Sequence, residues 1–343
     1  MPNQKTVKRP ERFLGSDELA ALLDHLAPLG CLDIGARGGV VGDIEPLGRA
    51  ASVYGFEPDE DECAKLNQSI ESNPHPFGTL QFLPVALGPK EEQRTLHIMR
   101  HEGASSLLSP DPDVTKRFGT RAAYFDVART VTIDTKPLDG VIADYAIANP
   151  VYMKIDVEGF ELEILKGAEA LLQSSLLAMR AEIAFLPCRI GQPDFGEIAA
   201  FLKQFNLMPM GFLYIIDWRS QTKVKHPRRM SGPLPYSRGQ MVHGDVLFLR
   251  DPHSLAENTD VEIKAKLSLA MLALLYDYVD FAHDIIASDR ISAYLHDVVG
   301  ADGLSGLSKA SRYLAKRHDR LAAKAWGRNL AKRAAFEMKH VFA

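Results

Sequence analysis

The chain has 343 residues, of which 46% are hydrophobic and 24% are charged. This ordinary composition excludes a largely disordered chain, and the length suggests two units or one large α/β domain with an appendage. The three cysteines are far apart and form no CxxC pair. Their spacing excludes a disulfide framework and a structural zinc site, and it fits a reducing compartment.

The charge is unevenly distributed. The formal net charge of −4 argues against a nucleic-acid partner. Residues 303–343 contain ten Lys or Arg and two acids, a net +8, so residues 1–302 carry −12. No apolar run reaches the ~18 residues that span a bilayer, and the basic start has no apolar stretch behind it. We therefore expect no membrane span, no signal peptide and a cytoplasmic location.

In the first part of the chain, short apolar runs alternate with helical patterns. Ser16 suits the cap of a helix in which leucines recur at helical spacing. The apolar runs are typical of buried strands, and a segment rich in Ser, Pro, Asp and Gly predicts a loop. We predict helices at Asp17–Leu26 and Asp59–Ser69, strands at Cys31–Ile34, Ser52–Phe56, Leu80–Leu87 and Thr95–Met99, and a loop at Gly103–Thr120.

The later part of the chain continues the alternation and then becomes helical. Strands separated by helices predict an α/β fold with a parallel, doubly wound sheet. The last two strands have no helix between them, so we expect them to pair antiparallel at one edge. We predict strands at Arg129–Asp134, Val151–Ile155, Ala178–Phe185, Phe212–Asp217 and Asp245–Arg250, and helices at Glu161–Leu172, Phe195–Phe205, Leu267–Tyr276, Tyr278–Ile286 and Lys309–Met338.

A glycine-rich turn follows the first predicted strand, in the segment DIGARGG that begins at Asp33. Glycines at the carboxyl end of such a strand let the backbone turn tightly and approach a ligand closely. Glu57 lies 22 residues after Gly35, where an acid can accept hydrogen bonds from both ribose hydroxyls of a nucleoside. Alternatively, the glycines only make a turn and Glu57 only caps the next helix.

The ligand that fits this turn has no pyrophosphate. The P-loop pattern GxxxxGK[ST] is absent, and Gly35-Ala36-Arg37 breaks the dinucleotide pattern GxGxxG. An acid followed by GxxxG suits S-adenosylmethionine, which has an adenine, a ribose and a zwitterionic amino-acid end. The missing GxGxxG argues against a nicotinamide oxidoreductase, which is an alternative for this fold class.

A second acidic motif follows a later strand. Asp156 and Glu158 come directly after Val151–Ile155, at the sheet edge where ligands bind in open α/β folds. The same two acids are also suited to capping the following helix. The motif therefore leaves two interpretations open, a ligand site or a helix cap.

Several segments together resemble the FkbM family of S-adenosylmethionine-dependent methyltransferases. The resemblance covers roughly residues 29–250. It implies a Rossmann-like seven-stranded methyltransferase sheet with the last strand antiparallel, and methylation of a hydroxyl oxygen. The segments that carry it are LDIGARGG (32–39), VYGFEPDEDECAKLN (53–67), PVALG (84–88), ASSLL (104–108), TIDTKPLDG (132–140), MKIDVEGFELEILKGA (153–168), AEI (181–183) and GDVLFLR (244–250).

By this resemblance, residues of the two motifs bind the methyl donor. Arg37 departs from the family, which commonly has Asn there. Ser105 and Ser106 match a family segment near the site. The residues assigned to the donor are Asp33, Gly35, Ala36, Gly39, Glu57 and Asp156, and the catalytic candidates are Asp156, Glu158 and Glu182.

A hydroxyl acceptor needs a base to take its proton. Besides the three catalytic acids, His101 and His243 are candidates, whereas Lys154 and Arg180 are expected to pair with acids. Three carboxylates at one place could instead hold Mg²⁺. Holding oxygen, methyl carbon and sulfur in line is expected to supply up to ~7–11 kcal/mol.

Two basic regions bear on partners. The insert Arg219–Gln240 suits a lid over an anionic acceptor, or is simply a solvated loop. The basic C-terminal helix is expected to pack on the chain or on a second copy, with weak contact to a membrane surface as the alternative.

We predict an N-terminal segment (1–28), a methyltransferase domain (29–252) and a helical basic extension (253–343). The predicted activity is O-methylation of a glycan, glycolipid or secondary metabolite. The alternative is a non-catalytic module that binds the adenosyl ligand and acts through its tail.

Overall fold

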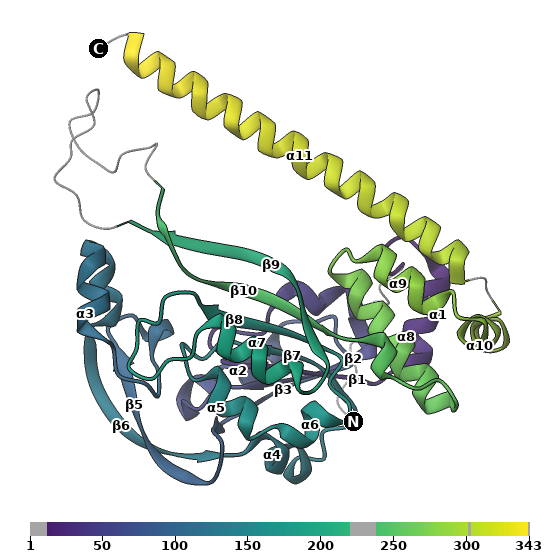
Figure 1. The fold of residues 1–343 in the computed structure, drawn as a ribbon, viewed down its shortest axis with the longest axis horizontal. Coiled ribbons are helices and arrows are strands. Elements are labelled where there is room, and N and C mark those ends of the chain that lie inside the picture. The colour runs from purple at the N-terminus through teal and green to yellow at the C-terminus, as the bar shows by residue number, and fades with distance from the viewer. Residues whose placement is uncertain (1–11, 220–237, 301–302, 342–343) are drawn as a thin grey trace.

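The computed structural model describes residues 12–219, 238–300 and 303–341, with side chains at all of these except 119–120, 329–330 and 332–341. Its centre is a seven-stranded sheet in the order β3-β2-β1-β7-β8-β10-β9 (Figure 1). β10 runs antiparallel to both of its neighbours, and the other strands run in one direction. The strands are β1 (Leu29–Ile34), β2 (Ala51–Phe56), β3 (Thr79–Leu83), β7 (Pro150–Ile155), β8 (Ala178–Ala184), β9 (Leu207–Trp218) and β10 (Gln240–Arg250).

This sheet confirms the predicted Rossmann-like fold with an antiparallel last strand. The prediction of one strand over Leu80–Leu87 is wrong, because Pro84 and Val85 separate β3 from a second, smaller sheet. That sheet has the order β4-β6-β5 and lies beside the carboxyl ends of the main strands (Figure 1). Its strands are β4 (Ala86–Leu87), β5 (Glu92–Met99) and β6 (Val127–Lys136).

One face of the main sheet is covered by helices from the two ends of the chain. α8 is buried all around from Leu267 to Leu275, as expected of a helix segment without a polar face, and it packs on β8 and β10. The same apolar core includes residues of β1, β2 and β7, so α1 and α8 share it with the sheet. These helices are α1 (Asp17–Leu26), α8 (Asp260–Leu275), α9 (Val279–Ile286), α10 (Asp289–Val299) and α11 (Gly303–Val341).

The opposite face carries the helices of the βα units. Glu161–Leu172 is not one helix as predicted, since Gly167 and Ala168 divide it into α5 and α6. The segment Gly103–Thr120, predicted as a loop, contains helical turns. On this face lie α4 (Leu138–Asp144), α5 (Glu161–Lys166), α6 (Glu169–Gln173) and α7 (Phe195–Lys203). The remaining elements are α2 (Glu60–Ser72), α3 (Pro112–Thr115) and the 3-10 segments η1 (Gly42–Ala50), η2 (Glu102–Ala104), η3 (Lys116–Phe125) and η4 (Pro252–Ser254), of which η1 packs with α1 and α8 on the first face.

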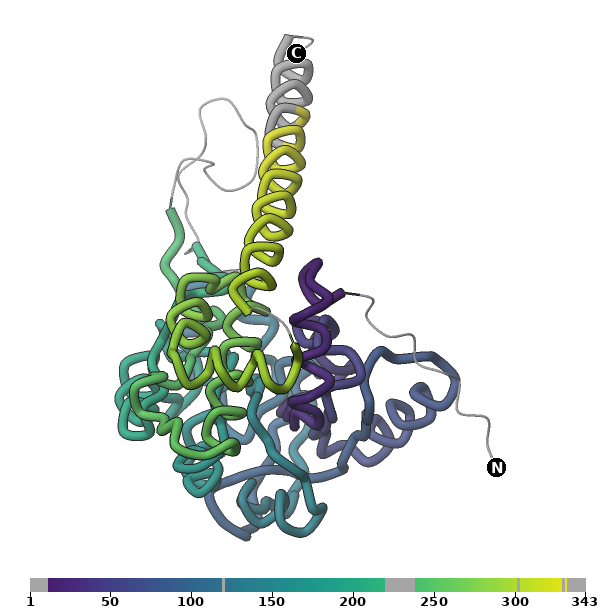
Figure 2. The backbone as a smooth tube through the Cα atoms, turned by 90° about the vertical axis from the view of Figure 1, so that its right-hand side faces the viewer, coloured from purple at the N-terminus to yellow at the C-terminus, as the bar shows by residue number. Residues whose placement is uncertain are grey.

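The long helix α11 leaves the body of the molecule (Figure 2). Its first turns pack through Leu307, Ala310 and Leu314, which are buried against the core that contains α1 and α9. Further along, the side chains of Leu321 and Trp326 are 53% and 68% exposed. Among the side chains that the structure describes in this helix, the expected packing on the chain is therefore seen in the first turns. Among the described residues, no helix combines the length and apolar character needed to cross a membrane.

Candidate active site

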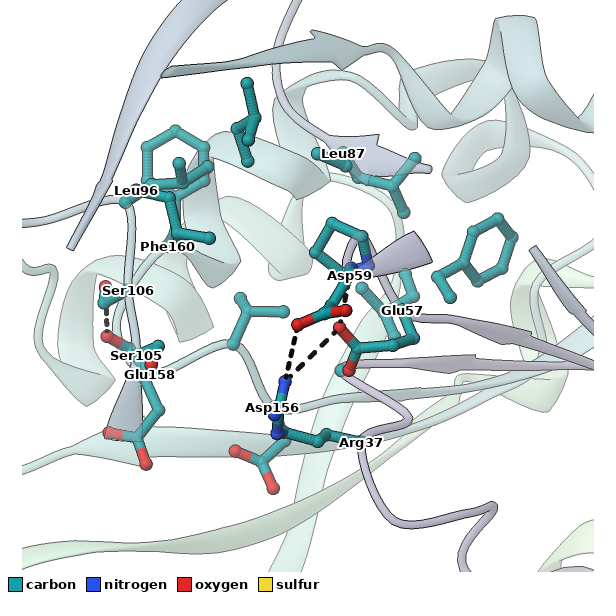
Figure 3. Close-up of a pocket in the computed structure, with 18 of the residues that line it drawn as sticks. Arg37, Glu57, Asp59, Leu87, Leu96, Ser105, Ser106, Asp156, Glu158 and Phe160 are labelled. Atoms are coloured by element: carbon teal, nitrogen blue, oxygen red, sulfur yellow. Dashed lines mark hydrogen bonds and ion pairs between the residues drawn. The ribbon is translucent and has the colours of Figure 1, made fainter. Parts of the chain in front are cut away.

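A cavity of about 160 Å³ lies at the carboxyl ends of β1, β2 and β7, and we call it the first cavity. Figure 3 shows its acids, together with apolar side chains from the small sheet and from the start of α5. It unites the two motifs, because Gly35, Glu57, Asp156 and Glu158 all line it. Asp33, Ala36 and Gly39, which the resemblance also assigns to the donor, do not line it.

Gly35 holds the two motifs in contact. Its φ of +84° belongs to the left-handed region that favours glycine. A Cβ at this position would lie 1.9 Å from the carbonyl oxygen of Asp156. The Asp156 amide in turn donates to the carbonyl of Ile34 at 3.0 Å. The two strand ends therefore approach as closely as their backbones allow, and only glycine fits between them.

Asp33 and Lys154 hold this turn in place through a hydrogen bond and ion pairs. The buried Asp33 carboxylate accepts a hydrogen bond from the Val41 amide at 2.8 Å, which ties down the far end of the glycine-rich turn. Lys154 Nζ lies 3.4 Å from Asp33 Oδ1 and 3.3 Å from Asp156 Oδ2. Burial alone would lower the pKa of Lys154, but these two carboxylates together raise it. Lys154 therefore pairs with acids, as predicted.

Glu57 stands at the end of β2 with one oxygen already bonded. Its Oε1 accepts the Asp59 amide at 2.9 Å, and Oε2 has no hydrogen-bond partner among the described residues. Burial raises the pKa of this carboxyl group, and the Asp59 amide and the Arg37 guanidinium act in the opposite direction. One acceptor oxygen thus remains for a ligand hydroxyl, as a ribose would require.

Arg37, where the family commonly has Asn, crosses the mouth of the first cavity. Its Nη1 lies 3.8 Å from Glu57 Oε1 and 3.7 Å from Asp59 Oδ2 (Figure 3). Its Nη2 pairs with Glu102 from the small sheet's side. A single guanidinium therefore joins both sides of the opening above the glycine-rich turn.

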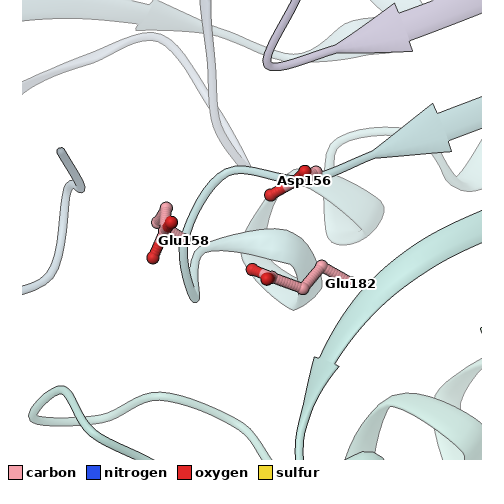
Figure 4. Close-up of side chains that lie close together, drawn as sticks. All are labelled: Asp156, Glu158 and Glu182. Atoms are coloured by element: carbon pink, nitrogen blue, oxygen red, sulfur yellow. The ribbon is translucent and has the colours of Figure 1, made fainter. Parts of the chain in front are cut away.

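Asp156, Glu158 and Glu182 converge, as the sequence predicts, with ligand oxygens within 4.8 Å of one another (Figure 4). Each of the three has a partner of its own, which for Asp156 is Lys154 at 3.3 Å. Glu158 Oε2 accepts from Arg189 Nη2 at 2.5 Å, and Glu182 Oε1 lies 2.8 Å from His243 Nδ1. Because partnered carboxylates are explained without an ion, we assign no Mg²⁺ to this group.

The crowding of acids shifts their protonation. Burial raises the pKa of Glu158 to about 7, with Arg189 opposing and Asp156 adding to the shift. Burial, together with the nearby carboxylates of Asp156 and Glu158, raises the pKa of Glu182 well above its usual value. Glu161 is buried behind them and accepts the amides of Val157 and Gly159 at 3.0 Å. Glu161 therefore holds the turn that carries Asp156 and Glu158.

The serines matched by the resemblance also reach this turn. Ser106 Oγ donates to the Glu158 carbonyl at 2.8 Å, and both Ser105 and Ser106 line the first cavity. Arg189, which sequence reasoning missed, donates to the Ala104 carbonyl at 2.8 Å as well as to Glu158. Its only sequence signal is its place a few residues after β8, at the same edge of the sheet.

The remaining residues that the sequence analysis singled out lie in different places. His243 meets Glu182, whereas His101 is exposed, stacks on Tyr124 and lines neither cavity of this region. Arg180 pairs with Asp245 at 2.5 Å and with Asp43, as predicted for a structural cation. Of the basic insert, residues 220–237 lie outside the described part of the chain.

A family profile described as the methyltransferase FkbM domain matches residues 33–207. The hexuronic acid methyltransferase AglP of Haloferax volcanii is 29% identical over 124 residues, which are 36% of this chain and 44% of AglP. The chain thus covers less than half the length of that relative.

Solved structures of methyltransferases are also similar. The methyltransferase FkbM from Methylobacillus flagellatus KT has 15% identity and a TM-score of 0.34, with 64% of this chain and 43% of that chain covered. The magnesium protoporphyrin IX methyltransferase ChlM from Synechocystis PCC 6803, solved with bound SAM, has 12% identity and a TM-score of 0.33, with coverage of 73% and 93%.

Proposed function

The chain belongs to the FkbM methyltransferase family, and on that premise we propose that it transfers a methyl group from S-adenosylmethionine to a hydroxyl oxygen. The acceptor class is a glycan, a glycolipid or another secondary metabolite. The observation that carries the proposal is the first cavity, in which Gly35, Glu57 and Asp156 stand together at three strand ends.

The first cavity has the groups that this donor needs. Leu87 and Phe160 offer an apolar surface for a purine ring, and Glu57 offers a carboxylate oxygen to a ribose hydroxyl. A side chain at Gly35 would clash with the Asp156 carbonyl, so glycine there keeps together the two strand ends that line the cavity. The residues present therefore fit the donor, and Asp33 and Lys154 act by holding the turn rather than by touching it.

The acids at the inner end suit the reactive part of the donor. When bound, S-adenosylmethionine supplies a methyl group on a positively charged sulfur, which an oxygen nucleophile attacks in line. Asp156 and Glu158 place negative charge at that end of the cavity. Their task is to orient the bound molecule, because alignment of the reacting atoms supplies up to ~7–11 kcal/mol. Glu182 lies one strand further out and belongs to the acceptor side.

A carbohydrate acceptor is supported by the relative AglP, whose printed name is hexuronic acid methyltransferase. The acidic cluster is also consistent with a hydroxyl acceptor, since such a nucleophile needs a base. The expected partner is therefore a small-molecule or glycan acceptor, and we expect no nucleic-acid partner. Contact of the basic tail with a membrane surface, a homodimer, a cytoplasmic location and the boundaries at 28 and 252 stay predictions.

The test is calorimetry with S-adenosylmethionine and with NAD. We expect binding of the first ligand only, and Glu57→Gln should weaken it about 10- to 100-fold, because one hydrogen bond to a charged group contributes ~1.5–3 kcal/mol. Glu60→Gln, on the neighbouring helix and outside the cavity, is the matched control. Unchanged binding by Glu57→Gln would remove the ribose role. Release of S-adenosylhomocysteine with a glycan acceptor separates an enzyme from a binding module.

A further inference from the structure

A second cavity of about 330 Å³ adjoins the first and shares Glu158 with it. Its walls come from η3, from β8 and the loop after it, and from the facing ends of β9 and β10. Glu182 and His243 line this cavity and are absent from the lining of the first. A group in the second cavity would therefore meet a group in the first beside Glu158.

The polar end of the second cavity is a hydrogen-bonded pair. Glu182 Oε1 and His243 Nδ1 are 2.8 Å apart across neighbouring antiparallel strands. The other ring nitrogen, Nε2, has no partner among the described residues. Burial lowers the pKa of His243, and the nearby cations Arg121 and Arg189 act in the same direction, whereas Asp156 and Asp245 oppose it. This shift favours the neutral ring, which with its proton on Nδ1 toward Glu182 has Nε2 free to accept a proton.

The opposite side is aromatic. Tyr124, Phe125 and Trp218 line the cavity, and the Phe125 and Trp218 rings pack edge to face at 6.0 Å. Trp218 also meets the His243 ring at 5.8 Å. Aromatic faces pack against apolar C–H groups, and a saccharide ring has such a face together with hydroxyls at its edge. A ring lying on these aromatics would direct its edge hydroxyls to the polar end.

A cation stands at the rim. The exposed Arg121 lines the cavity, lies 5.4 Å above the Tyr124 ring and has no carboxylate partner in the described part of the chain. An arginine fork binds a carboxylate with two parallel hydrogen bonds. The deeper Arg189 is held by Glu158 and backbone carbonyls, so of the two arginines among the described lining residues it is Arg121 that is placed to recognise an acidic ligand.

We propose that the second cavity is the acceptor site, that it takes a saccharide ring bearing a carboxylate, and that the pair His243–Glu182 receives the proton of the hydroxyl being methylated. This inference rests on the proposed methyl transfer. The acceptor oxygen forms its bond to the methyl carbon as the carbon–sulfur bond breaks. The electron pair goes to sulfur and the hydroxyl proton goes to His243 Nε2.

Binding can be tested without the methyl donor, because the sequence has two tryptophans, Trp218 and the exposed Trp326 on α11. In a Trp326→Phe background, fluorescence reports the second cavity alone. We expect a saturable change with methyl β-D-glucuronide and at least about tenfold weaker binding of methyl β-D-glucoside. Arg121→Gln should remove this difference. No saturable change with either sugar, or equal affinities in the parent protein, would overturn the proposal.

The proton role is tested by turnover, read as S-adenosylhomocysteine release with methyl β-D-glucuronide. His243→Gln should lower kcat about 10²- to 10⁴-fold while glucuronide binding changes less than about threefold. His253→Gln, exposed on η4 and outside both cavities, is the control. Sugar binding without turnover, or unchanged kcat in His243→Gln, would contradict the assignment. If S-adenosylmethionine binds through Glu57 but the sugar-binding and turnover assays fail, the acceptor-site proposal is wrong while the proposed donor site stands.

Discussion

The two cavities are built in different ways. The first is formed at parallel strand ends by short motifs, DIGARGG and KIDVEG, in which the important residues lie within a few positions of one another. The second is assembled from η3, the loop after β8 and the β9–β10 pair, which are far apart along the chain. One side of a transfer site can therefore be visible in the sequence as a motif, while the other side exists only after folding.

The largest expected effect tests the contact that makes the first cavity. Gly35→Ala should abolish measurable S-adenosylmethionine binding, because the new Cβ would lie 1.9 Å from the Asp156 carbonyl. Gly38→Ala is the control, since its φ of +83° matches the +84° of Gly35 while nothing lies within 4 Å of its Cβ. It should cost only about 1–2 kcal/mol of backbone strain. Calorimetry and urea unfolding measure both variants. Equal losses would mean that backbone conformation, not the close approach, explains Gly35.

A smaller effect concerns the junction of the two cavities. Glu158 has a pKa raised to about 7, so it gains its charge as the pH rises from about 6 to 8. The positive sulfur of S-adenosylmethionine should therefore bind roughly three- to tenfold more tightly at pH 8 than at pH 6. S-adenosylhomocysteine, which lacks that charge, should change less than about twofold. Parallel pH curves for the two ligands would show that the carboxylates do not face the sulfur.

The smallest effect lies on the covered face of the sheet, away from both cavities. Lys309 of α11 donates to Glu18 of α1 and lowers the pKa of Glu18 to about 2. Such a depressed pKa stabilises the fold above about pH 4.5, and the stabilisation is lost as the pH falls toward 2. Lys309→Met should lower the free energy of unfolding by about 0.5–1 kcal/mol at pH 7 and by almost nothing at pH 2.

Lys316→Met, at an exposed position of the same helix, is the control for this surface pair. Neither variant should alter binding of either ligand. A change in S-adenosylmethionine or glucuronide affinity with Lys309→Met would mean that the two faces of the sheet are coupled.

The sequence predicts most of the main sheet, because its strands are short apolar runs ended by glycines or acids. It misleads where one residue interrupts a continuous pattern, as at Pro84 between β3 and β4 and at Gly167 between α5 and α6. The amphipathic α10 was not predicted, although Ile291 and Leu295 on it are buried at helical spacing. These differences arise because a local sequence pattern does not determine which sheet or core a segment joins.

The same division applies to the site. Gly35, Glu57, Asp156 and Glu158 belong to motifs, and the structure brings them to one cavity. The convergence of Glu182 on them was predicted from its strand, whereas its pairing with His243 depends on the register of β8 against β10. Arg189, Arg121 and Trp218 have no motif at all, since their meeting requires turns and a hairpin that sequence periodicity does not place.

Helix α11 has a consequence for how the protein tolerates shortening. Among the side chains of this helix that the structure describes, Leu314 is the last buried one, so about 20 Å of helix from there to Arg328 has no apolar core against it. Helical turns that lack such support are marginally stable in water. The body therefore gains little folding free energy from these turns, so their sequence can change without disturbing either cavity.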